Sequence, residues 1–149
     1  MSKTATSADE LSLPQQRYVE IIGELLRREK EARITEVAEL LEVSAPSASE
    51  AVKRLTDLEI TKRTAQQGIE LTEKGWQIAD QLENRHQALR RFMVEVLAMQ
   101  PVQADEIACR VEHCVDRRFT DRLVNLARFL EKEHPATLQA IAKHLSRKD

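Results

Sequence analysis

The sequence predicts a mainly α-helical protein in which an N-terminal winged helix-turn-helix is followed by a helical domain. Three observations lead to this fold class. Apolar residues recur at intervals of three and four over most of the chain, as they do in amphipathic helices. β-branched residues cluster closely only at 60–64 and 69–72. The 149 residues include only three glycines and 3% aromatics, which disfavours all-β folds and modules that stack bases on aromatic rings.

We predict three segments: a flexible arm over residues 1–11, a DNA-binding domain over 12–74 and a helical domain over 75–149. The arm consists of small and polar residues, which cannot bury enough apolar surface to become ordered. No apolar run reaches the roughly 18 residues of a membrane span, and the N-terminus lacks the pattern of a signal peptide. The sequence therefore predicts a cytoplasmic protein with no membrane partner.

The DNA-binding domain is expected to begin with a helix from near Pro14 to about Lys30. A short helix over 35–41 and a third helix that restarts after the break at 44–47 form a helix-turn-helix. The two β-branched clusters, separated by a loop that contains Gly68, predict a β-hairpin. This order of elements is that of a winged helix-turn-helix, whose third helix enters the major groove of double-stranded DNA.

The helical domain is expected to begin with a long helix, Glu73 to about Ala98, whose apolar seam includes His86. Pro101 separates it from a fifth helix near 104–115. A sixth helix and, after Pro135, a seventh complete a predicted helical bundle.

The formal net charge of −2 provides no basic field, so any argument for DNA binding depends on local placement. Short hydroxyl side chains at the front of the third helix suit base edges or phosphates, and the Lys and Arg residues further along suit phosphates. The candidate DNA contacts are Ser44, Pro46, Ser47, Ser49, Glu50, Lys53 and Arg54 on the helix, with Lys62, Arg63, Gln66 and Gln67 on the wing.

A second group of chemically capable residues lies on the fifth predicted helix. On an α-helix Asp105, Cys109, Glu112 and His113 fall within a sector about 100° wide. A thiolate, a carboxylate and an imidazole that face one way suit Fe2+, Zn2+ or Co2+ better than Mg2+ or Ca2+. One helix supplies too few ligands to close a site, so His86 is the natural additional donor.

Other interpretations of these residues stay open at this point. A charged helix face is commonly only solvated, and a single histidine in an apolar seam is often a hydrogen-bonded core residue. Cys114 lies about 140° around the helix from Cys109, so the two thiols cannot form a disulfide within an intact helix. Cys109 and His113 could act as nucleophile and base, but no orienting third group accompanies them, and the chain is predicted not to be an enzyme.

A family resemblance is carried by five segments: Pro14 to Leu26, Ile34 to Leu55, Thr72-Glu73-Lys74-Gly75, Arg85-His86 and Ala108-Cys109-Arg110-Val111-Glu112-His113. Together they resemble the diphtheria toxin repressor family of metal-dependent transcriptional regulators over residues 14–132. The short length resembles the two-domain manganese transport regulator branch. Cys109 instead resembles the iron-responsive branch.

The resemblance implies a homodimer that binds a palindromic operator when a metal fixes the spacing of its DNA-binding heads. Residues 75–149 would form the dimerisation and metal-binding domain. The implied metal ligands are Glu20, His86, Cys109, Glu112 and His113, with Asp105 as a further candidate. The implied function is a repressor of metal-uptake or iron-homeostasis genes that responds to Fe2+, with Mn2+ as the alternative and Zn2+ third.

Three residues depart from the family pattern. Arg17 stands where the family has a metal-binding Met or Asp, and Arg90 and Asp105 stand where iron-branch members have two ligands of a second site. Since a guanidinium cannot ligate a cation, either one metal remains or Arg17 pairs with Glu112 or Asp105 and replaces a metal's charge.

Two alternative functions stay open. One is a winged-helix regulator that has lost metal control and senses thiol oxidation or another effector. The other is a metal-buffering protein whose helix-turn-helix contacts other proteins instead of DNA.

Overall fold

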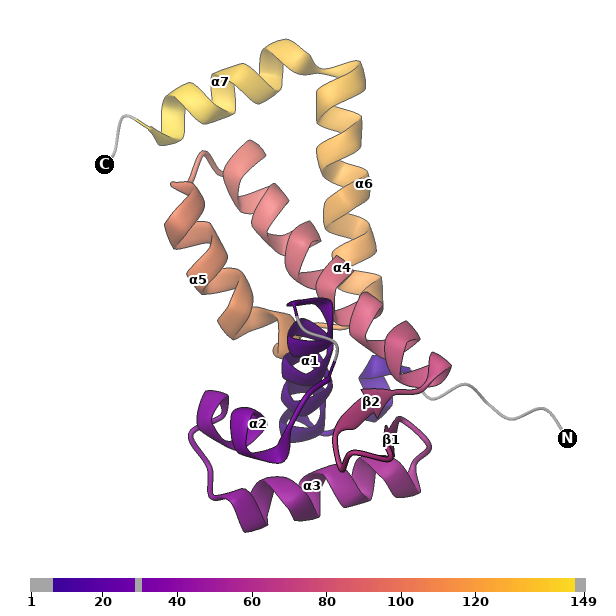
Figure 1. Ribbon diagram of the computed structural model, residues 1–149. Coiled ribbons are helices and arrows are strands. Elements are labelled where there is room, and N and C mark those ends of the chain that lie inside the picture. Colours follow the sequence, from indigo (N-terminus) through magenta and orange to yellow (C-terminus); the bar gives the residue numbers. More distant parts are fainter. Residues whose placement is uncertain (1–6, 29–30, 147–149) are drawn as a thin grey trace, which may run out of the picture. The chain divides into compact units, whose positions relative to one another are not determined.

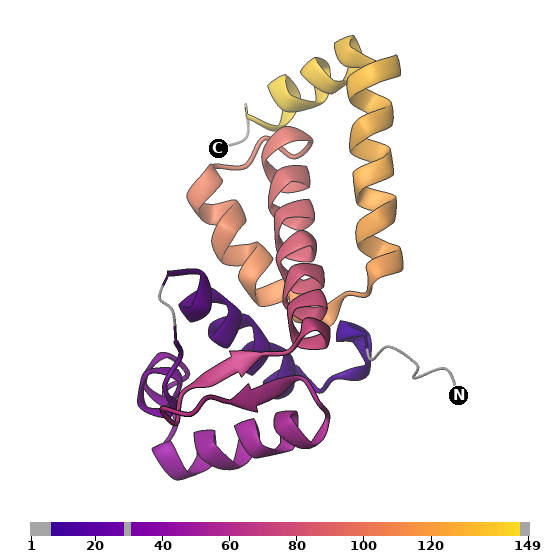
Figure 2. The same ribbon diagram turned by 45° about the vertical axis from the view of Figure 1, so that its right-hand side comes forward.

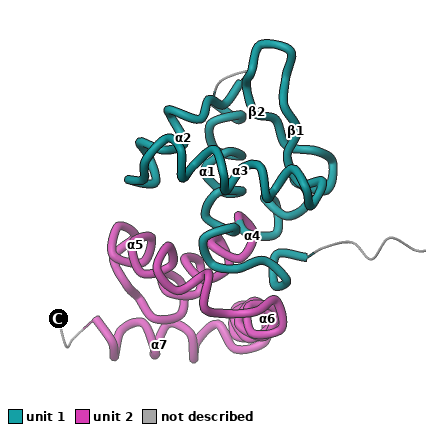
Figure 3. Tube along the Cα trace, turned by 90° about the horizontal axis from the view of Figure 1, so that it is seen from below, with its two compact units in different colours: residues 1–82 teal, residues 83–149 magenta. Residues whose placement is uncertain are grey.

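The computed structural model describes residues 7–28 and 31–146, which form two compact units (Figures 1–3). The first unit is residues 1–82 and the second is residues 83–149, so the division falls inside the long helix α4. In chain order the elements are the 3₁₀ helix η1 (Ala8–Glu10), α1 (Leu13–Arg28), α2 (Ile34–Leu40), α3 (Ala45–Asp57), β1 (Thr61–Arg63), β2 (Ile69–Leu71), α4 (Glu73–Glu95), α5 (Pro101–Val111), the 3₁₀ helix η2 (Glu112–Cys114), α6 (Arg117–Glu133) and α7 (Pro135–Leu145).

The first unit has the predicted winged helix-turn-helix fold. Its core is formed by the apolar faces of α1, α2 and α3 together with the hairpin. The hairpin is antiparallel, with Thr61 opposite Leu71 and Arg63 opposite Ile69. Ser44 caps α3, since its Oγ accepts a hydrogen bond of 3.3 Å from the Ser47 amide, and Pro46 lies in the first turn of that helix.

The hairpin is tied to the start of α4 by Thr72. The Thr72 hydroxyl donates to the Glu59 carbonyl over 2.6 Å and accepts from the Gly75 amide over 3.1 Å. A Cβ atom at position 75 would collide with the carbonyl oxygen of Ile60, so only glycine allows this close approach. The Thr72-Glu73-Lys74-Gly75 segment therefore fixes where the wing ends and the long helix begins.

The prediction of a flexible arm over residues 1–11 is wrong for residues 7–11. These residues pack against the rest of the first unit. Ala8 and Leu11 are 0% and 6% exposed. The side-chain amide of Gln16 donates to their carbonyl oxygens over 2.9 and 3.2 Å, and the Ala8 amide donates to Gln81 Oε1 over 3.0 Å. These polar contacts order a segment whose composition alone indicates a flexible arm. Residues 1–6 of the predicted arm lie outside the described residues.

The second unit is a set of helices, as predicted, but its fifth helix has different ends. We expected this helix near 104–115, whereas α5 begins at Pro101 and ends at Val111. Proline is well tolerated in a first turn because its missing N–H would have no partner there. At the other end the chain tightens into the 3₁₀ turn η2. No helix in the described part of the chain is long and apolar enough to cross a membrane.

Candidate metal centre and nucleic-acid interface

A buried carboxylate lies between two imidazoles in the second unit. Glu112 Oε2 is 2.8 Å from His86 Nδ1, and Glu112 Oε1 is 3.4 Å from His113 Nε2. The Glu112 side chain is 0% exposed, against 15% for His86 and 11% for His113. Removing a carboxylate from water is costly unless other groups compensate. His86 compensates through a hydrogen bond to Oε2, whereas Oε1 is buried without a hydrogen bond in the described part of the chain and lies beside the His113 ring.

The local fold explains why Glu112 faces this cluster. His86 comes from α4, whereas Glu112 and His113 belong to η2, immediately after the last residue of α5. A 3₁₀ turn has about three residues per turn instead of 3.6, so these two residues leave the helical register that we assumed from the sequence. The buried Arg85 donates from Nη1 to the Glu112 carbonyl oxygen over 3.2 Å. This bond ties η2 to α4.

Asp105 contacts the other side of His86. Its Oδ1 atom is 3.0 Å from His86 Nε2 and 3.4 Å from Arg90 Nε. The Asp105 side chain is 58% exposed, so this carboxylate lies at the solvent side of the cluster. Both ring nitrogens of His86 are therefore in contact with a carboxylate.

The structure thus brings His86, Asp105, Glu112 and His113 into one chain of contacts. Cys109 is exposed on α5, and neither it nor Cys114 forms a disulfide. Glu20 lies half-buried on α1, in the first unit. The contact of Arg85 with Glu112 was not predicted, since the sequence singled out Arg85 only within the Arg85-His86 resemblance. A charged residue in an apolar helix seam was the signal that could have identified it.

The donor set fits a divalent transition metal. Two imidazoles and a carboxylate are ligands that Mn2+, Fe2+ and Zn2+ accept, and the cluster is largely shielded from water. An adjacent thiol would add a softer donor.

Most of the predicted DNA-contact residues are exposed at the surface of the first unit. Ser49 is half-buried and the other candidates are exposed: Ser44, Pro46, Ser47, Glu50, Lys53 and Arg54 on α3, and Lys62, Arg63, Gln66 and Gln67 on the hairpin. The Ser44 and Ser47 hydroxyls lie 2.8 Å apart, so both take part in the cap of α3.

Several of the positive charges on this face are paired within the protein. Arg54 pairs with Glu50 over 2.5 Å, and Lys62 pairs with Glu70 over 3.1 Å. Exposed pairs of this kind contribute only about 0–1 kcal/mol to stability. Opening these pairs therefore costs the protein little stability.

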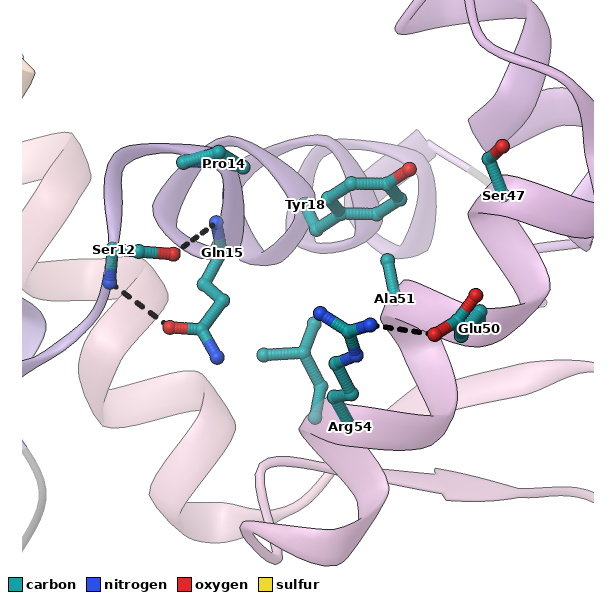
Figure 4. A pocket seen from close by; sticks show the side chains of 9 residues that line it. Ser12, Pro14, Gln15, Tyr18, Ser47, Glu50, Ala51 and Arg54 are labelled. Carbon is teal, nitrogen blue, oxygen red and sulfur yellow. Dashed lines mark hydrogen bonds and ion pairs between the residues drawn. The ribbon is translucent and has the colours of Figure 1, made fainter.

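A cavity of about 260 Å³ lies beside this face, between α3 and the start of α1 (Figure 4). Glu50 and Arg54 lie on its α3 side, and Ser12, Gln15 and Tyr18 lie on its α1 side. Burial raises the pKa of the Tyr18 phenol above its usual value of 10.0, so this hydroxyl is neutral at physiological pH. The side chains around this cavity thus include one ion pair, Glu50 with Arg54, and several neutral polar groups.

Comparison with known proteins connects both units to one family. The metal binding and dimerisation domain of iron dependent repressors matches residues 72–139. The transcriptional regulator MntR of Escherichia coli is 30% identical over 119 residues, which cover 80% of this chain and 74% of that protein.

Solved structures agree in fold. The manganese regulator SloR is 31% identical with a TM-score of 0.64, and the match covers 77% of this chain and 54% of SloR. IdeR of T. acidophilum gives a TM-score of 0.67 with 20% identity, and the match covers 77% of this chain and 54% of IdeR. This likeness supports the fold alone. This chain spans about half the length of these two structures.

We predict that Arg85→Ala lowers the free energy of unfolding of the protein by about 1–3 kcal/mol, because it removes a buried donor from the Glu112 carbonyl. The matched control is Arg91→Ala on the same helix. Arg91 pairs with Glu95 at the surface, so its loss is expected to cost less than about 0.5 kcal/mol. Urea unfolding followed by circular dichroism measures both, and equal effects would contradict a special role for Arg85.

Proposed function

Because this chain belongs to the diphtheria toxin repressor and manganese transport regulator family of metal-dependent transcriptional regulators, we propose that it binds an operator in double-stranded DNA in response to Fe2+ or Mn2+. The family consists of regulators, not enzymes. The observation that carries the proposal is the buried Glu112 carboxylate between the imidazoles of His86 and His113. The outer face of α3 and the hairpin is the proposed DNA-binding surface.

The proposed ligands come from both units. His86, Glu112 and His113 form the cluster in the second unit, and Cys109 lies one helical turn before His113. Glu20, on α1 of the first unit, is assigned by the family resemblance. Metal binding would then select one orientation of the DNA-binding unit, and DNA affinity and metal affinity would be linked.

The proposed order of metals rests on the chemistry of the donors. We place Fe2+ first because the Cys109 thiolate is a softer donor than Mn2+ prefers. Mn2+ is the second candidate, supported by the carboxylates and by the similarity to a manganese regulator. Zn2+ is third. The proposed role in the cytoplasm is repression of metal-uptake or iron-homeostasis genes through a palindromic operator.

We predict that Fe2+ raises the affinity of the protein for DNA from its own upstream region at least tenfold, and that Glu112→Gln abolishes this rise. The measurement is anaerobic fluorescence anisotropy, repeated with Mn2+ and at several salt concentrations. Phosphate contacts require the logarithm of the association constant to fall linearly with the logarithm of salt concentration. Glu106→Gln, an exposed carboxylate on α5, is the control and should behave as wild type.

Two outcomes would contradict this function. DNA binding that is equally tight with and without metal would favour a regulator that senses another effector. Metal binding with no salt-dependent DNA binding would favour a metal-buffering protein.

A face of α6 supports the proposed homodimer. Phe119, Leu126 and Phe129 recur at helical spacing and are 46%, 46% and 51% exposed. They lie within the segment that matches a dimerisation domain. Large apolar side chains that gather on one exposed face are typical of a surface that binds a partner. We therefore place the dimer contact on the C-terminal helices, with this face of α6 as its centre.

Leu126→Glu is predicted to weaken the dimer at least tenfold, because it puts an unpaired charge into the apolar contact. Arg128→Glu also places a glutamate on α6, at an exposed position about 160° around the helix from Leu126, and should leave the dimer intact. Sedimentation equilibrium measures both dissociation constants. Dimers of equal strength in the two variants would place the interface elsewhere.

A further inference from the structure

We propose that Asp105 is not a metal ligand but a positioning residue, which holds His86 from the solvent side and is itself held by Arg90. This inference rests on the metal site proposed above and assigns separate roles to its two carboxylates. Glu112 binds the ion, and Asp105 fixes the orientation and tautomer of the histidine that shares the ion with Glu112.

The two nitrogens of His86 face different carboxylates. Nδ1 is 2.8 Å from the buried Glu112, and Nε2 is 3.0 Å from Asp105. A neutral imidazole has one N–H and one lone pair, so only one nitrogen can ligate a metal. Histidine ligands almost always donate the remaining N–H to a carboxylate, a carbonyl or water. The geometry allows one of the two carboxylates to fill this outer role.

Charge and burial decide which carboxylate that is. The oxygen of Asp105 that contacts His86 also lies 3.4 Å from the guanidinium nitrogen Nε of Arg90. A guanidinium cannot ligate a cation and repels one. Asp105 is also 58% exposed, whereas Glu112 is fully buried. The cation therefore belongs on the Glu112 side, with Nδ1 as the ligating atom and Nε2–H as the donor to Asp105.

Arg90 then adjusts the affinity of the site. Its contact with Asp105 draws negative charge away from the His86 N–H and makes the imidazole a weaker donor to the ion. The same positive charge keeps a second cation from Asp105, so the inference implies one ion per subunit.

The test is the binding of Co2+ to the full chain, measured anaerobically by titration calorimetry and by visible absorption. Asp105→Ala should weaken binding about 10–100-fold, the usual cost of removing an outer partner of a ligand. Asp105→Asn should recover most of this loss, because its amide oxygen still accepts from Nε2–H. The Co2+ absorption spectrum and a stoichiometry of one should stay the same in both variants.

Arg90→Ala should tighten Co2+ binding several-fold, while Glu106→Ala, the neighbouring exposed carboxylate, should change nothing. Two results would overturn this inference but not the proposed function. One is an Asp105→Asn variant that binds Co2+ as weakly as Asp105→Ala and has an altered absorption spectrum, which would make Asp105 a ligand. The other is an Arg90→Ala variant with unchanged affinity for Co2+. A wild-type protein that binds no Co2+ would overturn the proposed function as well. Because Asp105 and Arg90 lie towards the solvent, all variants are expected to unfold at the wild-type urea midpoint.

Discussion

The burial of the Glu112 carboxylate at the end of α5 is the constraint on which the second unit depends. A carboxylate with no exposed surface needs partners: His86 shares a hydrogen bond with Oε2, and the His113 ring lies 3.4 Å from Oε1. Arg85 holds the backbone of the same residue from α4. The groups that compensate for the burial of Glu112 are also the groups that a divalent metal would bind. Local stability and the proposed metal binding therefore depend on the same few side chains.

The DNA-binding unit is readable from the sequence because its signals are local. Ser44 and Pro46 are suited to begin α3, and the β-branched clusters on either side of Gly68 are suited to a hairpin. Residues 7–11 are different, since their order depends on the side chains of Gln16 and Gln81. Such side-chain contacts leave no periodic pattern in the sequence, so composition alone predicts an arm.

The residue types of the candidate cluster suggest metal binding, but the geometry of the cluster could not be predicted. The residue types at 105–113 and at His86 indicate a site, whereas the register assumed for them requires an α-helix that continues past Val111. The structure places Glu112 and His113 in a 3₁₀ turn instead, which a buried arginine on α4 helps to fix. Nothing in the spacing of the sequence shows that Arg85 would reach the Glu112 carbonyl.

The structure shows which arginine contacts Asp105. The sequence left open a contact of Arg17 with Glu112 or Asp105 that would replace a metal's charge. In the structure Arg90 supplies the guanidinium at Asp105, from the helix that also carries His86. A protein charge at this outer position is compatible with an ion at the inner one, because the two lie on opposite sides of the imidazole.

The central claim is that Glu112 holds the metal. Anomalous diffraction from crystals of the protein loaded with Mn2+ tests it most directly, because the Mn2+ position is read from its own signal. The account predicts a peak bonded to the Glu112 carboxylate, to His113 and to Nδ1 of His86, with Asp105 still on Nε2. A peak bonded to Asp105, with Glu112 still hydrogen-bonded to His86, would contradict it.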